Sequence, residues 1–385
     1  MDNFDNLKQA TVAAHAAGNM DTASGGIVPP IQTSTTYIRD RDYQLHNSDN
    51  IYARDNSDVI RAAESIISKL ENADDSLLFP SGMAAITAVM RTIKNGGTLL
   101  FQSGIYWGTT KWVREFCIRR HIKSVEMDCA DAAALHAAIL KHKPDMVFVE
   151  TPSNPWLKIV DIAAAAQACA LVGCRLVVDS TAATPILSQP LHLGADIVMH
   201  SATKAINGHS DVLAGTLSVS DKSLPLWQDI ITDRHDAGAV IGNFEAWLLI
   251  RGMRTLPLRV ERMCESSLQV AEFLDDHAKV ETVFYPGLPA HTGHQIAAKQ
   301  MTGRFGHLLS FTILGNRKSA LDFCGALNLI HRATSLGGVE TLVEHRQTIE
   351  GDETGIPGTL LRLSVGIEHV DDLISDIAQA LDVVA

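Results

Sequence analysis

The chain has 385 residues, of which 46% are hydrophobic, and its formal net charge is −12. This length suits two domains with a large buried core, and the acidic balance excludes nucleic acid as the main partner. No apolar run reaches the ~20 residues that a membrane-spanning helix needs, so we expect no membrane partner. The six cysteines form no C-x-x-C pair and the first residues do not resemble a signal peptide, so we expect a cytoplasmic protein.

Residues 1–50 show little periodicity and many turn formers, which predicts an N-terminal arm. Helical patterns then alternate with short apolar runs. We expect helices over 59–70, 83–93, 109–120 and 161–173, and strands over 77–82, 96–102, 123–128, 145–150, 174–180 and 195–201. Strands that alternate with helices and are apolar throughout predict an α/β fold, with a mostly parallel sheet covered on both faces.

A long helical pattern over residues 245–275 leads into the last part of the chain. We interpret it as the connection to a smaller C-terminal α+β domain. The expected division is therefore an arm over 1–50, a large domain over 51–246 and a C-terminal domain over 247–385.

Polar residues gather at the carboxyl ends of the predicted strands, where open α/β sheets bind their ligands. Asp179 ends one strand, and Lys204 follows the end of the next. Gly82 and Met83 open a helix directly after an earlier strand, and Asn154 follows another. These groups therefore belong to a single edge of the predicted sheet.

The residue types at this edge suit pyridoxal 5′-phosphate. The amine of Lys204 can form a Schiff base with its aldehyde, and the carboxylate of Asp179 can keep its pyridine nitrogen protonated. A helix that begins at Gly82–Met83 can receive the phosphate, with hydrogen bonds added by Ser201 and Thr203. Taken singly, a lysine is usually a surface charge and an aspartate at a strand end is often a helix cap. Their combination on one sheet favours the cofactor.

Several segments, in order, resemble the Cys/Met-metabolism pyridoxal-phosphate enzymes, which include cystathionine γ-synthases, cystathionine γ-lyases and methionine γ-lyases. The similarity covers nearly the whole chain and is carried by "FPSGMAAI", "TPSNP", "VVDSTAATP", "GADIVMHSATKAINGHSDVLAG", "SLGGVETL" and "LLRLSVGIEHVDDLISDI". It implies a fold-type I architecture of the aspartate aminotransferase type. It also implies a homotetramer whose active sites are shared between subunits.

The resemblance also implies a role for each matching position. The catalytic residues would be Lys204, which bonds the cofactor and carries protons, and Tyr106, which stacks on its ring. The cofactor would be held by Lys204, Asp179, Gly82, Met83, Ser201, Thr203, Tyr106 and, from the neighbouring subunit, Tyr52 and Arg54. The α-carboxylate of an amino-acid substrate would be bound by Asn154, Ser335 and Arg362. No metal site is expected.

The chain departs from the family where substrates are distinguished. Two glutamates usual in cystathionine-using members are Ile51 and Thr334 here, and an arginine is Lys111. Methionine γ-lyases usually carry cysteine where this chain has Gly108, and β-lyases carry tryptophan where it has Leu336. The family's "GNPT" is replaced by residues 56–59, "NSDV". We expect Thr334 and Lys111 to face the far end of the substrate, and selectivity for cystathionine to be weak.

The sequence therefore predicts γ-elimination or γ-replacement on an L-amino acid with a γ-leaving group. Substrates of the cystathionine, methionine, O-acyl-homoserine or canavanine type fit this description. One alternative is β-elimination, as in cystathionine β-lyase, against which Leu336 argues. Another is a non-catalytic pyridoxal-phosphate-binding protein, against which Tyr106 and Arg362 argue.

Overall fold

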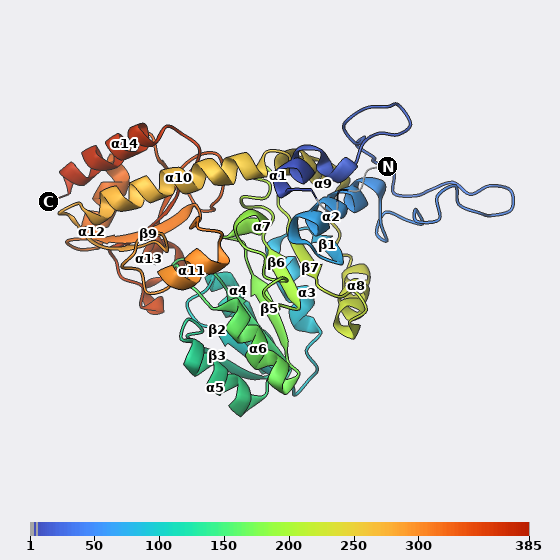
Figure 1. Ribbon diagram of the computed structural model, residues 1–385, viewed down its shortest axis with the longest axis horizontal. Coiled ribbons are helices and arrows are strands. Elements are labelled where there is room, and N and C mark those ends of the chain that lie inside the picture. The colour runs from blue at the N-terminus through green and yellow to red at the C-terminus, as the bar shows by residue number, and fades with distance from the viewer. Residues whose placement is uncertain (1–3, 5–6, 385) are drawn as a thin grey trace.

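Two β-sheets, joined by a long helix, make up most of the molecule (Figure 1). The computed structural model describes residues 4 and 7–384. The first sheet is built from strands between residues 75 and 219, and the second from strands between residues 280 and 364. No helix in these described residues is long and apolar enough to cross a membrane.

The large sheet has seven strands in the order β1-β7-β6-β5-β4-β2-β3. Their bounds are β1 (Asp75–Phe79), β2 (Thr98–Gln102), β3 (Lys123–Met127), β4 (Met146–Glu150), β5 (Arg175–Asp179), β6 (Ile197–His200) and β7 (Gly215–Val219). Every neighbouring pair is parallel except the two that involve β7, which runs antiparallel to β1 and to β6. The predicted α/β fold with a mostly parallel sheet is confirmed, and β7 is a strand that the sequence analysis missed.

Helices cover both faces of this sheet, as its apolar strands require. They are α2 (Asp58–Glu71), α3 (Gly82–Arg91), α4 (Trp107–Arg119), α5 (Ala132–His142), α6 (Ile162–Val172), α7 (Thr184–Leu187) and α8 (Pro225–Ala237). Alternate residues of β5 enter different cores: Val177 packs with the α3, α4 and α8 side, and Val178 packs with the α5 and α6 side. Both faces of β5 are thus buried, and Asp179 at its end is left facing the edge of the sheet.

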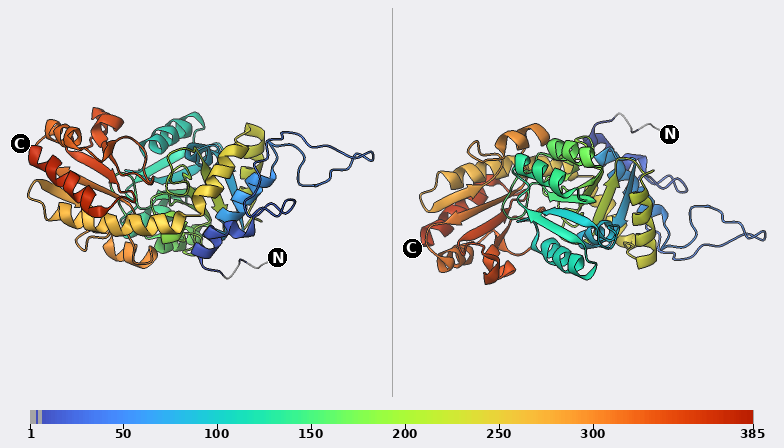
Figure 2. Two further views of the ribbon diagram at one scale, coloured as in Figure 1. Left: turned by 90° about the horizontal axis from the view of Figure 1, so that it is seen from above. Right: turned by 90° about the horizontal axis from the view of Figure 1, so that it is seen from below.

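The predicted helix over 245–275 is two helices, α9 (Asn243–Met253) and α10 (Leu256–Asp275). The chain turns at Thr255, and Pro257 then stands in the first turn of α10, where its missing N–H costs no hydrogen bond. The first half of α10 packs with α2 and α9 through Leu256 and Val260, while Val270 joins the core of the second sheet. This helix therefore connects the two sheets by packing against both (Figure 2).

The second sheet has five strands in the order β10-β11-β12-β9-β8. Its elements are β8 (Val280–Phe284), α11 (His294–Gln300), β9 (Leu308–Ile313), α12 (Arg317–Ala326), β10 (His331–Arg332), β11 (Leu342–His345), α13 (Arg346–Glu350), β12 (Leu360–Ser364) and α14 (Val370–Val383). α12, α14 and the end of α10 share one apolar core with this sheet. In the antiparallel pair β11–β12, Glu344 lies opposite Arg362.

Part of the expected arm is helical. α1 (Gln9–Ala14) places Val12 and Ala13 in the core that contains α2. After residue 20 the chain leaves the body of the molecule in long loops (Figure 1), on which Ile38 and Tyr43 expose 77% and 76% of their surface. The boundary expected between residues 246 and 247 lies inside α9.

Gly215 allows β7 to lie close against the turn that leads from β1 into α3. A Cβ atom on Gly215 would lie 2.2 Å from the carbonyl oxygen of Ser81. We therefore expect Gly215→Ala to lower the free energy of unfolding by about 1–3 kcal/mol, measured as a lower urea midpoint. Gly325→Ala is the matched control: it lies in α12, its Cβ would meet nothing within 4 Å, and alanine favours a helix. A Gly215→Ala midpoint at or above that of the unmodified protein would contradict this close packing.

Candidate active site

A cavity of about 890 Å³ opens between the carboxyl edge of the large sheet and strands β11 and β12 of the second sheet. It collects residues that lie far apart in the sequence. Of the residues predicted for the site, those that line it are Gly82, Met83, Tyr106, Asn154, Asp179, Ser201, Thr203, Lys204, Thr334, Ser335 and Arg362.

Lys204 lies in the loop after β6 and extends its amine into the cavity. Its Nζ donates a hydrogen bond to Ser335 Oγ at 2.9 Å, across the junction between the two sheets. Burial, with a further contribution from the charge of Arg362, lowers the pKa of Lys204 to about 8. A substantial fraction of the amine is therefore neutral near physiological pH, and the neutral amine is the nucleophilic form.

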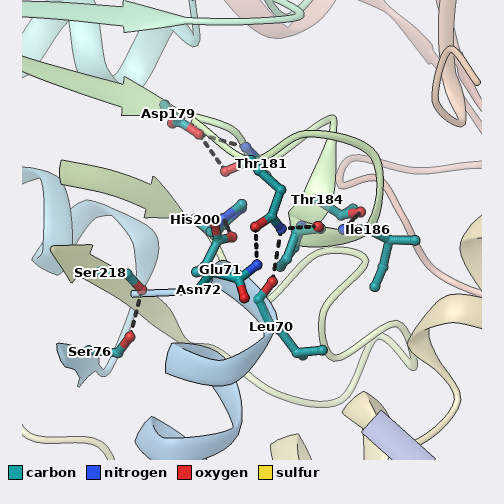
Figure 3. Close-up of polar contacts among 12 residues, drawn as sticks. Leu70, Glu71, Asn72, Ser76, Asp179, Thr181, Thr184, Ile186, His200 and Ser218 are labelled. Carbon is teal, nitrogen blue, oxygen red and sulfur yellow. Dashed lines mark hydrogen bonds and ion pairs between the residues drawn. The ribbon is translucent and has the colours of Figure 1, made fainter. Parts of the chain in front are cut away.

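Asp179 ends β5 and lines the cavity. Figure 3 shows its two hydrogen bonds with Thr181. Asp179 Oδ1 accepts hydrogen bonds from Thr181 N at 3.0 Å and Thr181 Oγ1 at 2.6 Å. Among the described residues no donor reaches Oδ2, so one oxygen stays available to a ligand. Burial raises the pKa of Asp179, and the two bonds from Thr181 oppose that shift.

A buried contact between a histidine and a glutamate lies beneath this edge of the sheet. His200 ends β6 and Glu71 ends α2, and Nε2 of the histidine lies 2.5 Å from Oε1 of the glutamate (Figure 3). Both side chains are completely buried. The pair fixes the end of the strand from which the Lys204 loop starts.

The beginning of α3 forms a cradle for an anion. Ser81 caps the helix by accepting a hydrogen bond from Ala84 N at 3.1 Å, and the N–H groups of Gly82 and Met83 have no acceptor within the helix. A Cβ on Gly82 would lie 2.8 Å from Ser201 Cβ, so only glycine lets the Ser201 backbone approach. Thr203 donates its hydroxyl proton to Ala214 O at 3.1 Å, so that proton is already committed.

Tyr106 lies on the cavity wall at the start of α4. Its backbone N–H donates to Glu150 Oε2 at 3.1 Å, and the N–H of Asn154 donates to Glu150 Oε1 at 2.6 Å. Burial, with the nearby charge of Asp179, raises the pKa of Glu150 to about 8. A Cβ on Gly108 would lie 2.7 Å from the ring of Tyr106, so glycine is needed for this ring position.

Arg362 forms the opposite wall with its side chain almost completely buried. Its Nη1 donates to Asn154 Oδ1 at 2.9 Å, and its Nη2 donates to Ser335 O at 2.7 Å. Burial lowers the pKa of Arg362 to about 10, which still leaves it charged at neutral pH. Ser335 has a φ of 90°, a strained conformation for a residue other than glycine. In this conformation the carbonyl of Ser335 accepts a hydrogen bond from Arg362, and its hydroxyl accepts one from Lys204.

Several cavity residues were given no role by the sequence analysis. They are Glu150, Thr181, Trp107, Glu344 and Arg346. Glu150 and Thr181 follow strand ends, which is the signal that could have identified them. Glu344 and Arg346 lie in and directly after the fully buried strand β11, where two buried charges are unusual enough to suggest a site.

Three predicted residues do not line the cavity of their own chain: Lys111, Tyr52 and Arg54. Lys111 lies on the exposed face of α4. Arg54 stacks over Tyr52, with 5.3 Å between its guanidinium carbon and the centre of the ring. Residues 55–59 contain the segment that departs from the family pattern. Here Asp55 lies 2.7 Å from His235 and Asp58 pairs with Arg61, so both carboxylates already have partners.

The donor set fits pyridoxal 5′-phosphate. A partly neutral lysine amine suits its aldehyde, and the available carboxylate oxygen of Asp179 suits its pyridine nitrogen. The start of α3, kept open by Gly82, suits its phosphate. The three features line one cavity, as a single ligand requires.

The lowered pKa of Lys204 predicts how its replacement affects stability. The folded chain releases the proton near pH 8, whereas the unfolded chain holds it to about 10.5, so burying the charged amine costs free energy below pH 8. Lys204→Met should raise the free energy of unfolding of cofactor-free protein by roughly 2–3 kcal/mol at pH 7. Less than half of that gain should remain at pH 10, as measured by urea unfolding at both values. An equal gain in the free energy of unfolding at pH 7 and at pH 10 would contradict the lowered pKa of Lys204.

Comparisons with known proteins agree with this site. The model of the family "Cys/Met metabolism PLP-dependent enzyme" matches residues 10–382. The chain is 40% identical to a cystathionine gamma-synthase of Mycobacterium tuberculosis, covering 97% of this chain and 96% of that one. It is 36% identical to an L-methionine gamma-lyase of Fusobacterium nucleatum subsp. polymorphum, covering 97% of both.

Solved structures agree as well. The crystal structure of metB from Corynebacterium glutamicum superposes with a TM-score of 0.94 and is 37% identical, covering 99% of both chains. The fold-type I architecture expected from the sequence is therefore confirmed. The chain belongs to the Cys/Met metabolism PLP-dependent enzymes, and pyridoxal 5′-phosphate is its cofactor.

Proposed function

We propose that this enzyme eliminates or replaces the γ-substituent of an L-amino acid. Family membership supports γ-elimination or γ-replacement in general. The observation that carries the proposal for this chain is the position of Lys204. Its amine, with a pKa near 8, is hydrogen-bonded to Ser335, the residue whose carbonyl holds Arg362.

Each wall of the cavity has a proposed task. Asp179, Gly82, Met83 and Ser201 would hold the cofactor on the side of the large sheet. Thr203 would join them by turning its hydroxyl proton from Ala214 O to the phosphate. When bound, pyridoxal 5′-phosphate supplies an electron sink that stabilises negative charge at the α-carbon of an amino acid. On the opposite wall, Arg362 would bind the α-carboxylate of the substrate, with Asn154 and Ser335 positioning its guanidinium.

Proton transfer is assigned to two side chains. A neutral Lys204 Nζ would take the proton from the substrate α-carbon and pass it to the electron sink that the cofactor supplies. The amine, neutral again, would then take a proton from the β-carbon, which allows the γ-group to leave. The low pKa of Lys204 suits this task, because a general base works best with a pKa near the working pH. Tyr106 also lines the cavity, and its hydroxyl would give a proton to the departing γ-group.

The identity of the γ-group depends on residues that differ from those of cystathionine-using relatives. Thr334 lines the cavity and carries no charge, so it offers no anion to a distal ammonium group. Ile51 is 54% exposed and lies outside this cavity, as does Lys111. Weak selectivity for cystathionine remains our expectation, and the role of Lys111 remains a prediction.

The active site is proposed to be shared between subunits of a homotetramer. Tyr52 and Arg54 lie outside the cavity of their own chain, directly after the arm of residues 1–50, whose loops extend away from the body. The same arm exposes Ile38 and Tyr43, which a neighbouring subunit would cover. We propose that Arg54 reaches the phosphate site of that neighbour.

A substrate panel tests the reaction. Purified enzyme is assayed with cystathionine, methionine, O-acetylhomoserine and canavanine, with and without a thiol nucleophile. We expect 2-oxobutanoate or a new γ-substituted amino acid, and a kcat/KM for cystathionine less than tenfold above the best of the others. Lys204→Ala should lower kcat by about 10³-fold or more, because the base is lost. Pyruvate as the main product would identify β-elimination, and turnover by Lys204→Ala within tenfold of the unmodified enzyme would remove Lys204 from its role.

Mixed oligomers test the shared site. Arg54→Ala and Lys204→Ala chains, each inactive alone, are mixed under conditions of confirmed subunit exchange. A mixed pair would regain one intact site, so about a quarter of the unmodified activity should return. Lys204→Ala mixed with Asp179→Asn is the matched control, because both residues line the cavity of one chain and no intact site can form. An absence of recovery in the first mixture would contradict a role for Arg54 across subunits.

A further inference from the structure

Four buried charges form a row in the cavity wall made by β11, β12 and α13: Arg362, Glu344, Arg346 and Glu350. Arg362 Nη2 lies 2.5 Å from Glu344 Oε2, and the same oxygen pairs with Arg346 Nη1. Arg346 Nη2 pairs in turn with Glu350 Oε1. None of the four side chains is more than 8% exposed. The signs therefore alternate along the row, beginning with the arginine proposed to bind the substrate carboxylate.

The backbone sets the order of this row. Glu344 and Arg362 occupy facing positions in the antiparallel pair β11–β12. Arg346 is the first residue of α13, and Glu350 follows one helical turn later on the same side. Arg346 and Glu344 both line the cavity, whereas Glu350 lies behind Arg346 and does not.

Glu344 is an obstacle to the role proposed for Arg362. A substrate carboxylate that approaches Arg362 meets a guanidinium that already has a carboxylate 2.5 Å away. If Glu344 were paired with Arg362 alone, that pair would be neutral. The second anion would then be repelled by the first in a site where screening by water is weak. Arg346 changes this balance, because it bonds to the very oxygen of Glu344 that Arg362 uses.

We propose that Arg346 is a positioning residue for substrate binding. By neutralising Glu344, Arg346 leaves the charge of Arg362 available to the α-carboxylate of the substrate. The negative carboxylate then stands next to the positive Arg362, so the charges still alternate along the row. Arg362 Nε is buried and has no hydrogen-bond partner among the described residues, so this donor is open to a carboxylate. The inference depends on the role of Arg362 given under the proposed function.

The test measures the affinity of the holoenzyme for glycine by calorimetry. Glycine carries the α-carboxylate but has no γ-group, so its binding is independent of γ-chemistry. Arg346→Met alone would leave Glu350 buried without its cationic partner, which destabilises the fold. The comparison is therefore between Glu350→Gln and the double variant Arg346→Met/Glu350→Gln, which differ only in the charge of Arg346.

We expect Glu350→Gln to bind glycine as tightly as the unmodified enzyme or more tightly. The double variant should bind glycine about tenfold more weakly than Glu350→Gln, since Glu344 is then neutralised by Arg362 alone. It should also raise KM for every amino-acid substrate while kcat changes less than threefold. Adding Glu344→Gln to the double variant removes the repelling anion and should return the dissociation constant to within threefold of the original value.

Three results would overturn the inference. One is glycine binding by the double variant within twofold of Glu350→Gln. Another is a loss confined to cystathionine, whose second carboxylate would then be the group that Arg346 binds. The third is a failure of Glu344→Gln to restore affinity. Arg362→Met separates this inference from the proposed function: unchanged glycine binding by that variant would reject the role of Arg362 itself. A loss with Arg362→Met but not with the double variant would reject the role of Arg346 alone.

Discussion

The cost of burying charge governs the arrangement of this active site. Lys204, Asp179, Glu150 and Arg362 share one cavity between two sheets, and the last three expose 5% or less of their surface. An ionised group placed there needs a partner or shifts its pKa toward the neutral form. Among the described residues, the amine of Lys204 has one hydrogen-bond partner, the hydroxyl of Ser335, and its pKa falls to about 8. Arg362 has a carboxylate and two carbonyl oxygens, and it stays charged.

The same cost explains why the site lies where two sheets meet. The edge of the large sheet supplies Asp179 and the loop that carries Lys204, while β11 and β12 supply the arginine and its carboxylate. The Lys204–Ser335 hydrogen bond joins the two sides. Because α10 packs against both cores, the distance between these sides is set by helix packing rather than by a flexible linker. The amine of Lys204 and the guanidinium of Arg362 can thus lie in one cavity while each is bonded to different atoms.

Much of this arrangement could be predicted from the sequence because it is local. Asp179, Lys204 and Gly82 follow apolar strands within a few residues, and the end of a parallel strand is a reliable place for a ligand. The helix over 58–71 and the strands β2 to β6 were likewise visible as short-range patterns. β7 was missed because its sequence, GTLSV, has no continuous apolar run, and the turn at Thr255 was missed because a helical pattern continues on both sides of it.

Other features are long-range and leave little trace in the sequence. The alternating row depends on Glu344 facing Arg362, which is a matter of strand register, and on α13 beginning directly after β11. Gly108 and Gly215 are ordinary glycines in the sequence, and their need to be glycine becomes clear only from the neighbours that a Cβ would meet. Tyr52 and Arg54 could be singled out only through the resemblance to the family, and their proposed target belongs to another copy of the chain. The residues proposed to hold the cofactor are therefore easier to predict from the sequence than those proposed to balance the charge of Arg362, because the former depend on strand ends and the latter on how two sheets meet.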